Sequence, residues 1–302
     1  LATSPGHENM QYLREQVDAY LETVRFAEPG DLDGLVEAMR YSLLAGGKRI
    51  RPVLALATAR AIGMPQAEVM PLAGAIELIH TYSLIHDDLP AMDDDDLRRG
   101  QPTCHVKFGE DVAILAGDGL YAEAFRHLLS CQRSEPRLVL AAAAELAHAT
   151  GVNGMVGGQY VDVKEGSVDG SSGLRRLHEL KTGRLIGASV MCVLLLGDVG
   201  EPATMAFRQF VAELGVLFQI VDDILDVTGT DQALGKPRGS DERHGKHTYV
   251  SQFGVDRAKQ LAGESHRTAR EALGRIAHVD TERPYLPTEL EQITDFIYTR
   301  TS

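Results

Sequence analysis

The sequence predicts an all-α fold, with about ten or more helices in a single domain that spans residues 1–302. Apolar residues recur at spacings of three and four along most of the chain, which is the period of a helix face. Alternation with a period of two, which predicts strands, is almost absent. Apolar residues make up 44% of the chain and charged residues 24%, so a soluble protein of this length can bury a large core.

The predicted helices follow one another along the chain. Residues 1–8 are expected to be disordered, and the first helix begins near residue 9. Gly46-Gly47 is a C-cap signal that ends the second helix. Polar, Gly-rich loops are predicted at 166–173 and 230–249, and the longer loop has the length of a lid. The other helical stretches are 31–45, 48–63, 67–88, 104–131, 136–164, 183–197, 203–229, 251–276 and 288–300.

The composition excludes several classes of protein. A formal net charge of −13 argues against a nucleic-acid partner. No run of 18 apolar residues predicts a membrane span, and the acidic N-terminal stretch does not read as a signal peptide. Cys104, Cys131 and Cys192 form no CxxC pair and suit a reducing compartment. We therefore expect a cytoplasmic protein.

An acidic cluster occupies residues 85–100. Six aspartates fall between Asp87 and Asp96, and Arg98 and Arg99 follow at once. Carboxylates so close repel one another unless a cation neutralises them, and oxygen-only ligands suit Mg²⁺ or Ca²⁺. The arginines suit a ligand that is itself a phosphate. The cluster indicates a metal-bridged diphosphate site, with a solvated acidic turn as the alternative.

Pro90 matters for the geometry of this cluster. Asp87 and Asp93 are six residues apart and would lie on different faces of an unbroken helix. Pro90 cannot continue a regular helix. A kink there would let both carboxylates reach one site.

A second acidic motif lies within the apolar helix 203–229. Asp222 and Asp226 are four residues apart on one face, with Asp223 beside them. Charged side chains in so apolar a setting are rarely left unpaired. The motif suits a second set of metal ligands, and a structural salt bridge is the alternative. Gln159 and Asp162 likewise share one face of an earlier helix.

Basic residues gather at helix starts and in loops. Lys48, Arg49 and Arg51 suit the first turn of a helix, where backbone N–H groups favour anions; three solvated charges are the alternative. His80 lies on the apolar helix that carries Asp87, as a candidate ligand or a core histidine. If the two acidic motifs face each other, Mg²⁺ ions would bridge them to a diphosphate, and apolar walls would hold a hydrocarbon tail.

Several long motifs resemble one family. The chain is similar to the trans-isoprenyl diphosphate synthases, and more closely to the bacterial farnesyl diphosphate synthases. The resemblance covers nearly the whole chain and is carried by GGKRIRP (46–52), YSLIHDDLPAMDDDDLRRGQPTCHVKFGEDVAILAGDGL (82–120), GMVGGQYVDV (154–163), LKTGRLI (180–186), FQIVDDILDVTG (218–229) and GKPRGSDERHGKHTY (235–249).

This resemblance implies the isoprenoid synthase fold around a central apolar cavity, three Mg²⁺ ions, a homodimer, and condensation of isopentenyl diphosphate with dimethylallyl or geranyl diphosphate. It implies Lys181, Thr182 and Gln219 as catalytic residues, the last two facing the developing allylic cation. Position by position, it further implies Asp87, Asp93 and Asp222 as Mg²⁺ ligands, supported by Asp88, Asp223 and Asp226; Arg98, Lys181, Lys236 and Lys246 as binders of the allylic diphosphate; and Lys48, Arg51, His80 and Arg99 as the isopentenyl diphosphate site. Arg49 and Asp241 lie in matched segments with less definite roles, and Asp94, Asp95 and Asp96 have none.

Tyr82 is the candidate determinant of product length. It lies five residues before Asp87, roughly 7–8 Å along a helix. An aromatic ring there would close the cavity within a few prenyl units, although plain core packing is the alternative. The resemblance favours a fifteen-carbon product.

Other readings stay open. A geranylgeranyl or geranyl diphosphate synthase differs only in product. A terpene cyclase would not need the second set of cations. A non-catalytic regulatory subunit would be expected to have decayed acidic motifs, and a Ca²⁺-binding protein would show EF-hand spacing.

Overall fold

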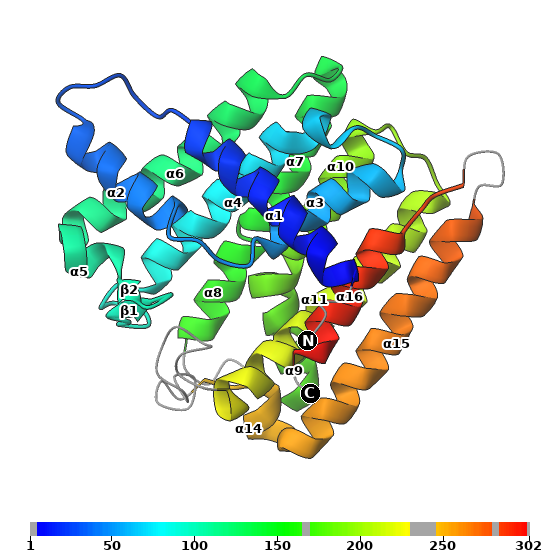
Figure 1. Ribbon diagram of the computed structural model, residues 1–302. Helices are drawn as coiled ribbons and strands as arrows, with labels where there is room; N and C mark the ends of the chain where they lie inside the picture. The colour runs from blue at the N-terminus through cyan, green and yellow to red at the C-terminus, as the bar shows by residue number, and fades with distance from the viewer. Residues whose placement is uncertain (1–4, 165–169, 230–245, 280–283, 301–302) are drawn as a thin grey trace.

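Helices make up nearly all the regular structure in the computed structural model, which describes residues 5–164, 170–229, 246–279 and 284–300 (Figure 1). The prediction of an all-α fold is confirmed. The helices are α1 (Pro5–Thr23), α2 (Asp33–Leu43), α3 (Ile50–Ala61), α4 (Gln66–Asp87), α5 (Cys104–Phe108), α6 (Glu110–Cys131), α7 (Pro136–Thr150), α8 (Met155–Val163), α9 (Gly170–His178), the π-helix η1 (Glu179–Gly183), α10 (Arg184–Leu196), α11 (Ala203–Thr228), α14 (Tyr249–Phe253), α15 (Val255–Val279) and α16 (Thr288–Thr299).

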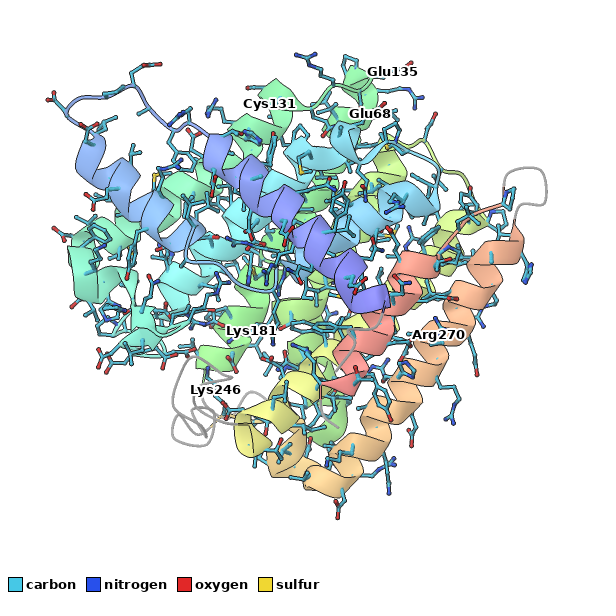
Figure 2. The ribbon with its side chains drawn as sticks, in the orientation of Figure 1. Glu68, Cys131, Glu135, Lys181, Lys246 and Arg270 are labelled. Carbon is cyan, nitrogen blue, oxygen red and sulfur yellow. The ribbon has the colours of Figure 1, made fainter. Side chains whose placement is uncertain are left out.

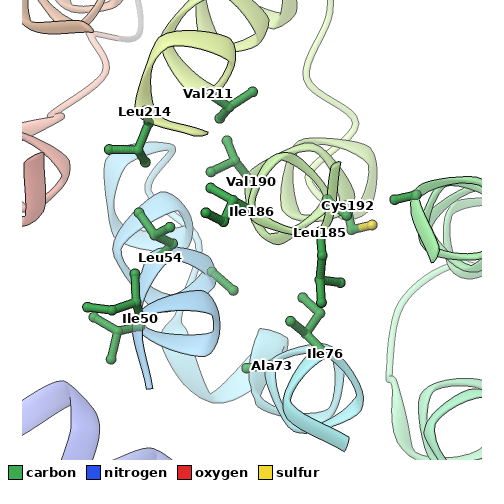
Figure 3. Close-up of a cluster of buried hydrophobic side chains, with 14 of the residues drawn as sticks. Ile50, Leu54, Ala73, Ile76, Leu185, Ile186, Val190, Cys192, Val211 and Leu214 are labelled. Atoms are coloured by element: carbon green, nitrogen blue, oxygen red, sulfur yellow. The ribbon is translucent and has the colours of Figure 1, made fainter. Parts of the chain in front are cut away.

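Helix α4 lies at the centre of the bundle because it is apolar on almost every side. It packs against α3, α6 and α10, and α11 packs against α10 and α15. Ile76 of α4, Leu54 of α3 and Ile186 of α10 meet in one buried cluster, which Leu214 of α11 joins (Figure 3). In the part of the chain that is described, no helix is both long and apolar enough to cross a membrane.

Glycines divide several helices that the sequence predicts as continuous. The stretch 104–131 breaks at Gly109, whose φ of 94° favours glycine. The stretch 136–164 breaks at 151–154, and α14 is separated from α15 at Gly254, with φ of 77°. Apolar periodicity continues across these breaks, which is why it did not reveal them.

Three further expectations need correction. Helix α1 begins at Pro5, inside the stretch expected to be disordered, and Asn9 anchors it to α16 by donating to Glu289 at 2.8 Å. Helix α9 begins at Gly170, inside the predicted loop 166–173. Helix α3 begins only at Ile50, after the first two basic residues of the predicted first turn.

A π-helix, η1, interrupts the helical path between α9 and α10. A π-turn holds one residue more than an α-turn and is common at functional sites. Here it contains Lys181 and Thr182. Helix α8 crosses it so closely at Gly158 that a methyl group there would overlap the backbone nitrogen of Lys181.

Replacing Gly158 with Ala should therefore lower the free energy of unfolding by about 1–3 kcal/mol, because overpacking against backbone cannot relax easily. Denaturant titration would measure it. Gly187→Ala is the matched control, since its added methyl would meet Val211 at an ordinary 3.7 Å. Equal stability of the two variants would contradict the close approach.

The ring of His178, at the end of α9, is buried and stacks on Tyr249, with ring centroids 5.5 Å apart. Burial lowers the pKa of His178 to about 4, with Asp162 acting in the opposite direction. An unfolded histidine has a pKa near 6.5. His178 is therefore protonated below about pH 6.5 in the unfolded chain but only below about pH 4 in the folded chain.

The free energy of unfolding should accordingly fall as the pH falls from about 6.5 to about 4, by on the order of 3 kcal/mol from this residue. Denaturant titrations across that range would measure the slope. His178→Gln should reduce it, while substitution of the exposed His278 should not. An unchanged slope in the His178 variant would contradict the assignment.

Candidate active site

One cavity of about 1150 Å³ gathers nearly all the residues predicted to be functional. Its walls come from the end of α4, the turn that follows, and the starts or faces of α3, α8, η1 and α11. Of the candidates in the described residues, only Asp88 is absent from the wall. Lys236 and Asp241 lie outside the described residues, as does most of the predicted lid. The lining candidates are Lys48, Arg51, His80, Tyr82, Asp87, Asp93, Arg98, Arg99, Lys181, Thr182, Gln219, Asp222, Asp223, Asp226 and Lys246.

The first acidic motif converges by ending the helix, not by kinking it. Helix α4 stops at Asp87, and the chain turns back through Pro90. The backbone N–H of Asp93 donates to the carbonyl of Asp87 at 2.9 Å. Both carboxylates therefore line the same cavity, as the sequence predicts.

The surroundings of Asp87 disfavour its negative charge unless a cation is close. Burial raises its pKa to about 6; Lys181 works against that shift, and the neighbouring Asp93 adds to it. Burial and the like charge of Asp93 both disfavour the ionised form of Asp87, and a bound cation would favour it.

Two lysines from other parts of the chain form ion pairs with carboxylates of the cavity wall. Lys246 donates to Asp93 at 2.8 Å, and Lys181 donates to Asp162 of α8 at 2.5 Å. Figure 2 shows both lysines toward the same end of the bundle. Lys181 and Lys246 are therefore each held by a carboxylate of the cavity wall.

A tight hairpin directs two adjacent arginines to different places. Strands β1 (Leu97–Arg98) and β2 (Gln101–Pro102) pair antiparallel, and Arg99 and Gly100 form the turn with φ of 54° and 75°. Two positive φ values are the mark of a type I′ turn. The sequence reading did not predict these strands, because two residues are too few for a periodic signal.

Arg98 binds the carboxylate of Asp88 with its Nε, at 2.7 and 2.9 Å from the two oxygens. Asp88 is buried behind the cavity wall, and Asp95 lies 3.6 Å from the same guanidinium. Asp88 is therefore placed to orient Arg98 and not to line the cavity. Asp95, to which the sequence analysis gave no role, contacts the same guanidinium group of Arg98.

Arg99 turns the other way. It donates to the carbonyl of Gly46, and its guanidinium occupies the space that a side chain at position 47 would need. Gly47 also has φ of 125°, a backbone conformation that favours glycine. The two adjacent arginines thus have different partners, the carboxylate of Asp88 for Arg98 and the carbonyl of Gly46 for Arg99.

Arg51 and Arg99 line a part of the cavity, here called the basic half, that also contains a neutral histidine, His80. Nη1 of Arg51 lies 3.4 Å from Nε2 of His80. Burial, and then the charges of Arg51 and Arg99, lower the pKa of His80 well below its ordinary value. A neutral ring can accept a hydrogen bond from a guanidinium.

The second acidic motif is built into a chain of hydrogen bonds. Thr182 Oγ1 donates to Gln219 Oε1 at 2.9 Å, and Gln219 Nε2 donates to Asp223 at 2.7 Å. The other oxygen of Asp223 accepts from the backbone N–H of Tyr249 at 2.7 Å. This chain fixes the Gln219 amide and links η1, α11 and α14. Asp222, next to Asp223, is exposed on the cavity wall.

The donor set fits Mg²⁺. Oxygen ligands come from two sides of the cavity, and Asp87 is buried among cations. No group of three acidic, histidine or cysteine side chains within the described ranges could hold a metal by itself. Mg²⁺ is usually bound by one or two carboxylates together with waters and substrate phosphates. A site completed by a diphosphate is consistent with both facts.

Sequence reasoning missed two residues of the cavity wall, Phe218 and Arg300. The guanidinium groups of Arg51 and Arg300 lie 5.9 and 5.3 Å from the centre of the Phe218 ring. Nη2 of Arg300 and Nε of Arg51 are buried without hydrogen-bond partners in the described structure. Arg300 follows the last helix, and no local pattern relates it to residues some 80 positions or more earlier.

Tyr82 lines the cavity on the side of α6. Its ring packs edge to face on His86 and on Tyr121, both with centroids 5.0 Å away. Tyr121 packs in turn on Phe125 at 5.4 Å. An aromatic layer thus closes this side of the cavity.

Comparisons with known proteins show the family of the chain. A family model described as polyprenyl synthetase matches residues 33–280. The chain is 47% identical over 256 residues to a farnesyl diphosphate synthase of Geobacillus stearothermophilus, covering 83% of this chain and 86% of that protein. It is 48% identical over 240 residues to a chloroplastic geranylgeranyl pyrophosphate synthase of Capsicum annuum, covering 78% of this chain and 65% of that longer protein.

A solved structure is similar over its whole length. It is the geranyltransferase from Helicobacter pylori complexed with magnesium and isoprenyl diphosphate, with a TM-score of 0.87 and 31% sequence identity. The match covers 99% of each chain.

Proposed function

Because the chain belongs to the polyprenyl synthetase family, we propose that it is a Mg²⁺-dependent prenyltransferase of one domain. It condenses isopentenyl diphosphate with dimethylallyl or geranyl diphosphate and forms farnesyl diphosphate and diphosphate. The observation that carries the proposal is the division of one cavity wall. Carboxylates paired with Lys181 and Lys246 form one set of lining groups, and Lys48, Arg51, His80 and Arg99 form a second, mainly basic set.

The acidic side is the allylic site of this proposal. Asp87, Asp93 and Asp222 would hold the Mg²⁺ ions, three by family resemblance, with Asp88, Asp223 and Asp226 supporting them. Bound Mg²⁺ supplies Lewis-acid neutralisation of the diphosphate.

Arg98, Lys181, Lys236 and Lys246 bind the same diphosphate. They stabilise the negative charge that grows on it as the allylic C–O bond breaks. For Lys181 and Lys246, the proposal requires the ammonium groups to turn from Asp162 and Asp93 toward the diphosphate.

The positive charge left on the allylic carbon needs polar but non-nucleophilic neighbours. Thr182 and Gln219 are held at the wall by their mutual hydrogen bond, and their oxygens are the proposed stabilising groups. The apolar part of the cavity excludes water that would quench the cation. The double bond of isopentenyl diphosphate then attacks the cation, and a proton leaves. No lining side chain is an evident base, so the released diphosphate takes the proton.

The basic side is the proposed isopentenyl diphosphate site, which needs no metal. Burial lowers the pKa of Arg51; Glu77 and Asp222 act against this shift, and the like charge of Arg99 adds to it. Burial and then the like charge of Arg300 lower the pKa of Lys48. A diphosphate relieves this repulsion, which favours its binding.

The product length is the part of the proposal that relatives leave open, because farnesyl and geranylgeranyl synthases match at 47% and 48% identity. A geranylgeranyl diphosphate synthase is therefore the second candidate. The aromatic layer at Tyr82 supports the shorter product. A non-catalytic subunit of a prenyltransferase would not need both acidic motifs and both sets of cations.

We also propose a homodimer. Large apolar side chains are exposed on one succession of elements that contact one another, α6, α7 and α8, and a second copy would cover them. They include Ile114, Leu115, Leu140, Val156 and Tyr160. A solution mass near twice 32.8 kDa by light scattering is expected, and a monomeric mass would contradict this. A cytoplasmic location is likewise proposed.

The deciding experiment is incubation of the protein with isopentenyl diphosphate and either dimethylallyl or geranyl diphosphate, with Mg²⁺ or with excess chelator. Fifteen-carbon product that forms only with metal is expected. A twenty-carbon main product would favour the second candidate. No metal-dependent condensation would overturn the function.

Tyr82→Ala should lengthen the main product by at least one five-carbon unit, because the ring that closes the cavity is removed. Gas chromatography of the dephosphorylated products would show this. Tyr82→Phe keeps the ring and should keep the wild-type length. Unchanged length in the Ala variant would rule out Tyr82 as the determinant.

A further inference from the structure

Glu77 is a buried carboxylate in the middle of α4 that none of the proposed roles uses. Its side chain is 1% exposed, yet it reaches the wall of the basic half of the cavity. Oε1 accepts from Nη1 of Arg49 at 2.6 Å. Oε2 is buried and has no hydrogen-bond partner in the described structure. A carboxylate beside a diphosphate site repels the ligand, so its presence there needs a reason.

Arg49 gives the first reason. Its φ is 49°, an uncommon value for a residue with a side chain. Three hydrogen bonds hold it: Nη1 to Glu77 at 2.6 Å, Nε to Asp18 at 2.8 Å and Nη2 to the carbonyl of Leu43 at 2.7 Å. Arg49 lies between Lys48 and Arg51 in sequence, so fixing it fixes the backbone that presents both to the cavity.

The charge of Glu77 gives the second reason. It is the largest influence that favours the charged form of Arg51 and of Arg99, against their burial. The other cations act against them: Arg99 on Arg51, and Arg49 and Arg98 on Arg99. The buried carboxylate of Glu77 thus contacts Arg49 and favours the charged forms of Arg51 and Arg99, and so opposes the repulsion among these three guanidinium groups.

We propose that Glu77 is a positioning residue for the second diphosphate site. Its carboxylate fixes Arg49 and holds Arg51 and Arg99 together, so that the cations stand ready for isopentenyl diphosphate before it binds. This inference rests on the proposed function. Repulsion between Glu77 and the diphosphate is outweighed because the arginines lose little further order when the ligand arrives.

Glu77→Gln tests the proposal, because the amide keeps the shape and one acceptor for Arg49 but removes the charge. We expect the KM for isopentenyl diphosphate to rise about tenfold, which is about 1.4 kcal/mol. The kcat and the KM for geranyl diphosphate should change less than about threefold, since the allylic site has its own carboxylates.

Asp18→Asn is the matched control. It removes the other carboxylate that Arg49 contacts, but Asp18 is 37% exposed, so its charge is screened by water. We expect less than about a threefold change in any constant. Thermal melts of both variants, followed by circular dichroism, show whether each is folded at the assay temperature.

Arg49→Lys covers the case in which the Glu77 variant does not fold. It keeps the charge but loses the guanidinium fork, and it should also raise the KM for isopentenyl diphosphate selectively. A second readout is calorimetric binding of isopentenyl diphosphate in chelator, where the metal-dependent site is silent; it should weaken in parallel.

Each outcome decides something. A folded Glu77→Gln protein with wild-type KM for isopentenyl diphosphate overturns the proposal. Equal rises in both KM values also overturn it, because they indicate general loss of structure. If the Glu77 variant is unfolded, an unchanged KM in Arg49→Lys overturns it. Failure of the wild-type protein to condense the substrates would instead count against the function itself.

Discussion

Compensation of like charges around a shared apolar cavity is the constraint on which the rest of the site depends. Several carboxylates and several guanidinium groups line the same cavity, on elements that pack into the helical core. Isolated buried charges are costly. The structure meets this cost by pairing opposite charges: Arg98 with Asp88 behind the cavity wall, and Arg49 with Glu77 and Lys181 with Asp162 on the wall itself.

These supporting contacts explain why the cavity can be both polar and open. Two of the arginines also have carboxylate partners that do not line the cavity, Asp88 for Arg98 and Asp18 for Arg49. Under the proposed function, a diphosphate with its metal ions would exchange for ion pairs that already exist in the cavity, such as Lys246–Asp93 and Lys181–Asp162.

The sequence was sufficient for much of this arrangement. Helical periodicity gave the fold class, and the spacing of Asp87 and Asp93 around Pro90 gave their convergence. What it could not give were features that depend on distant packing. Arg300 enters the cavity from the last helix, and Glu77 looks like any acidic residue in an apolar helix until Arg49 is seen against it. The breaks at Gly109 and Gly254 leave the apolar period unchanged, so the period does not reveal them. The two-residue strands are too short to produce a period of their own.

The π-helix has a consequence for how such a chain can vary. Along a helix, the direction of the side chain turns by about 100° from one residue to the next. The extra residue in η1 therefore sets how the side chains of α10 are rotated relative to those of α9. Lys181 and Thr182 lie within this single offset. Loss of one residue from η1 would leave α9 and α10 helical and their apolar faces individually intact. It would nonetheless put the two helices out of phase, so that the core and the side chains of Lys181 and Thr182 could no longer both be correctly oriented. Insertions and deletions that surface turns tolerate should therefore be absent from this one turn of the bundle.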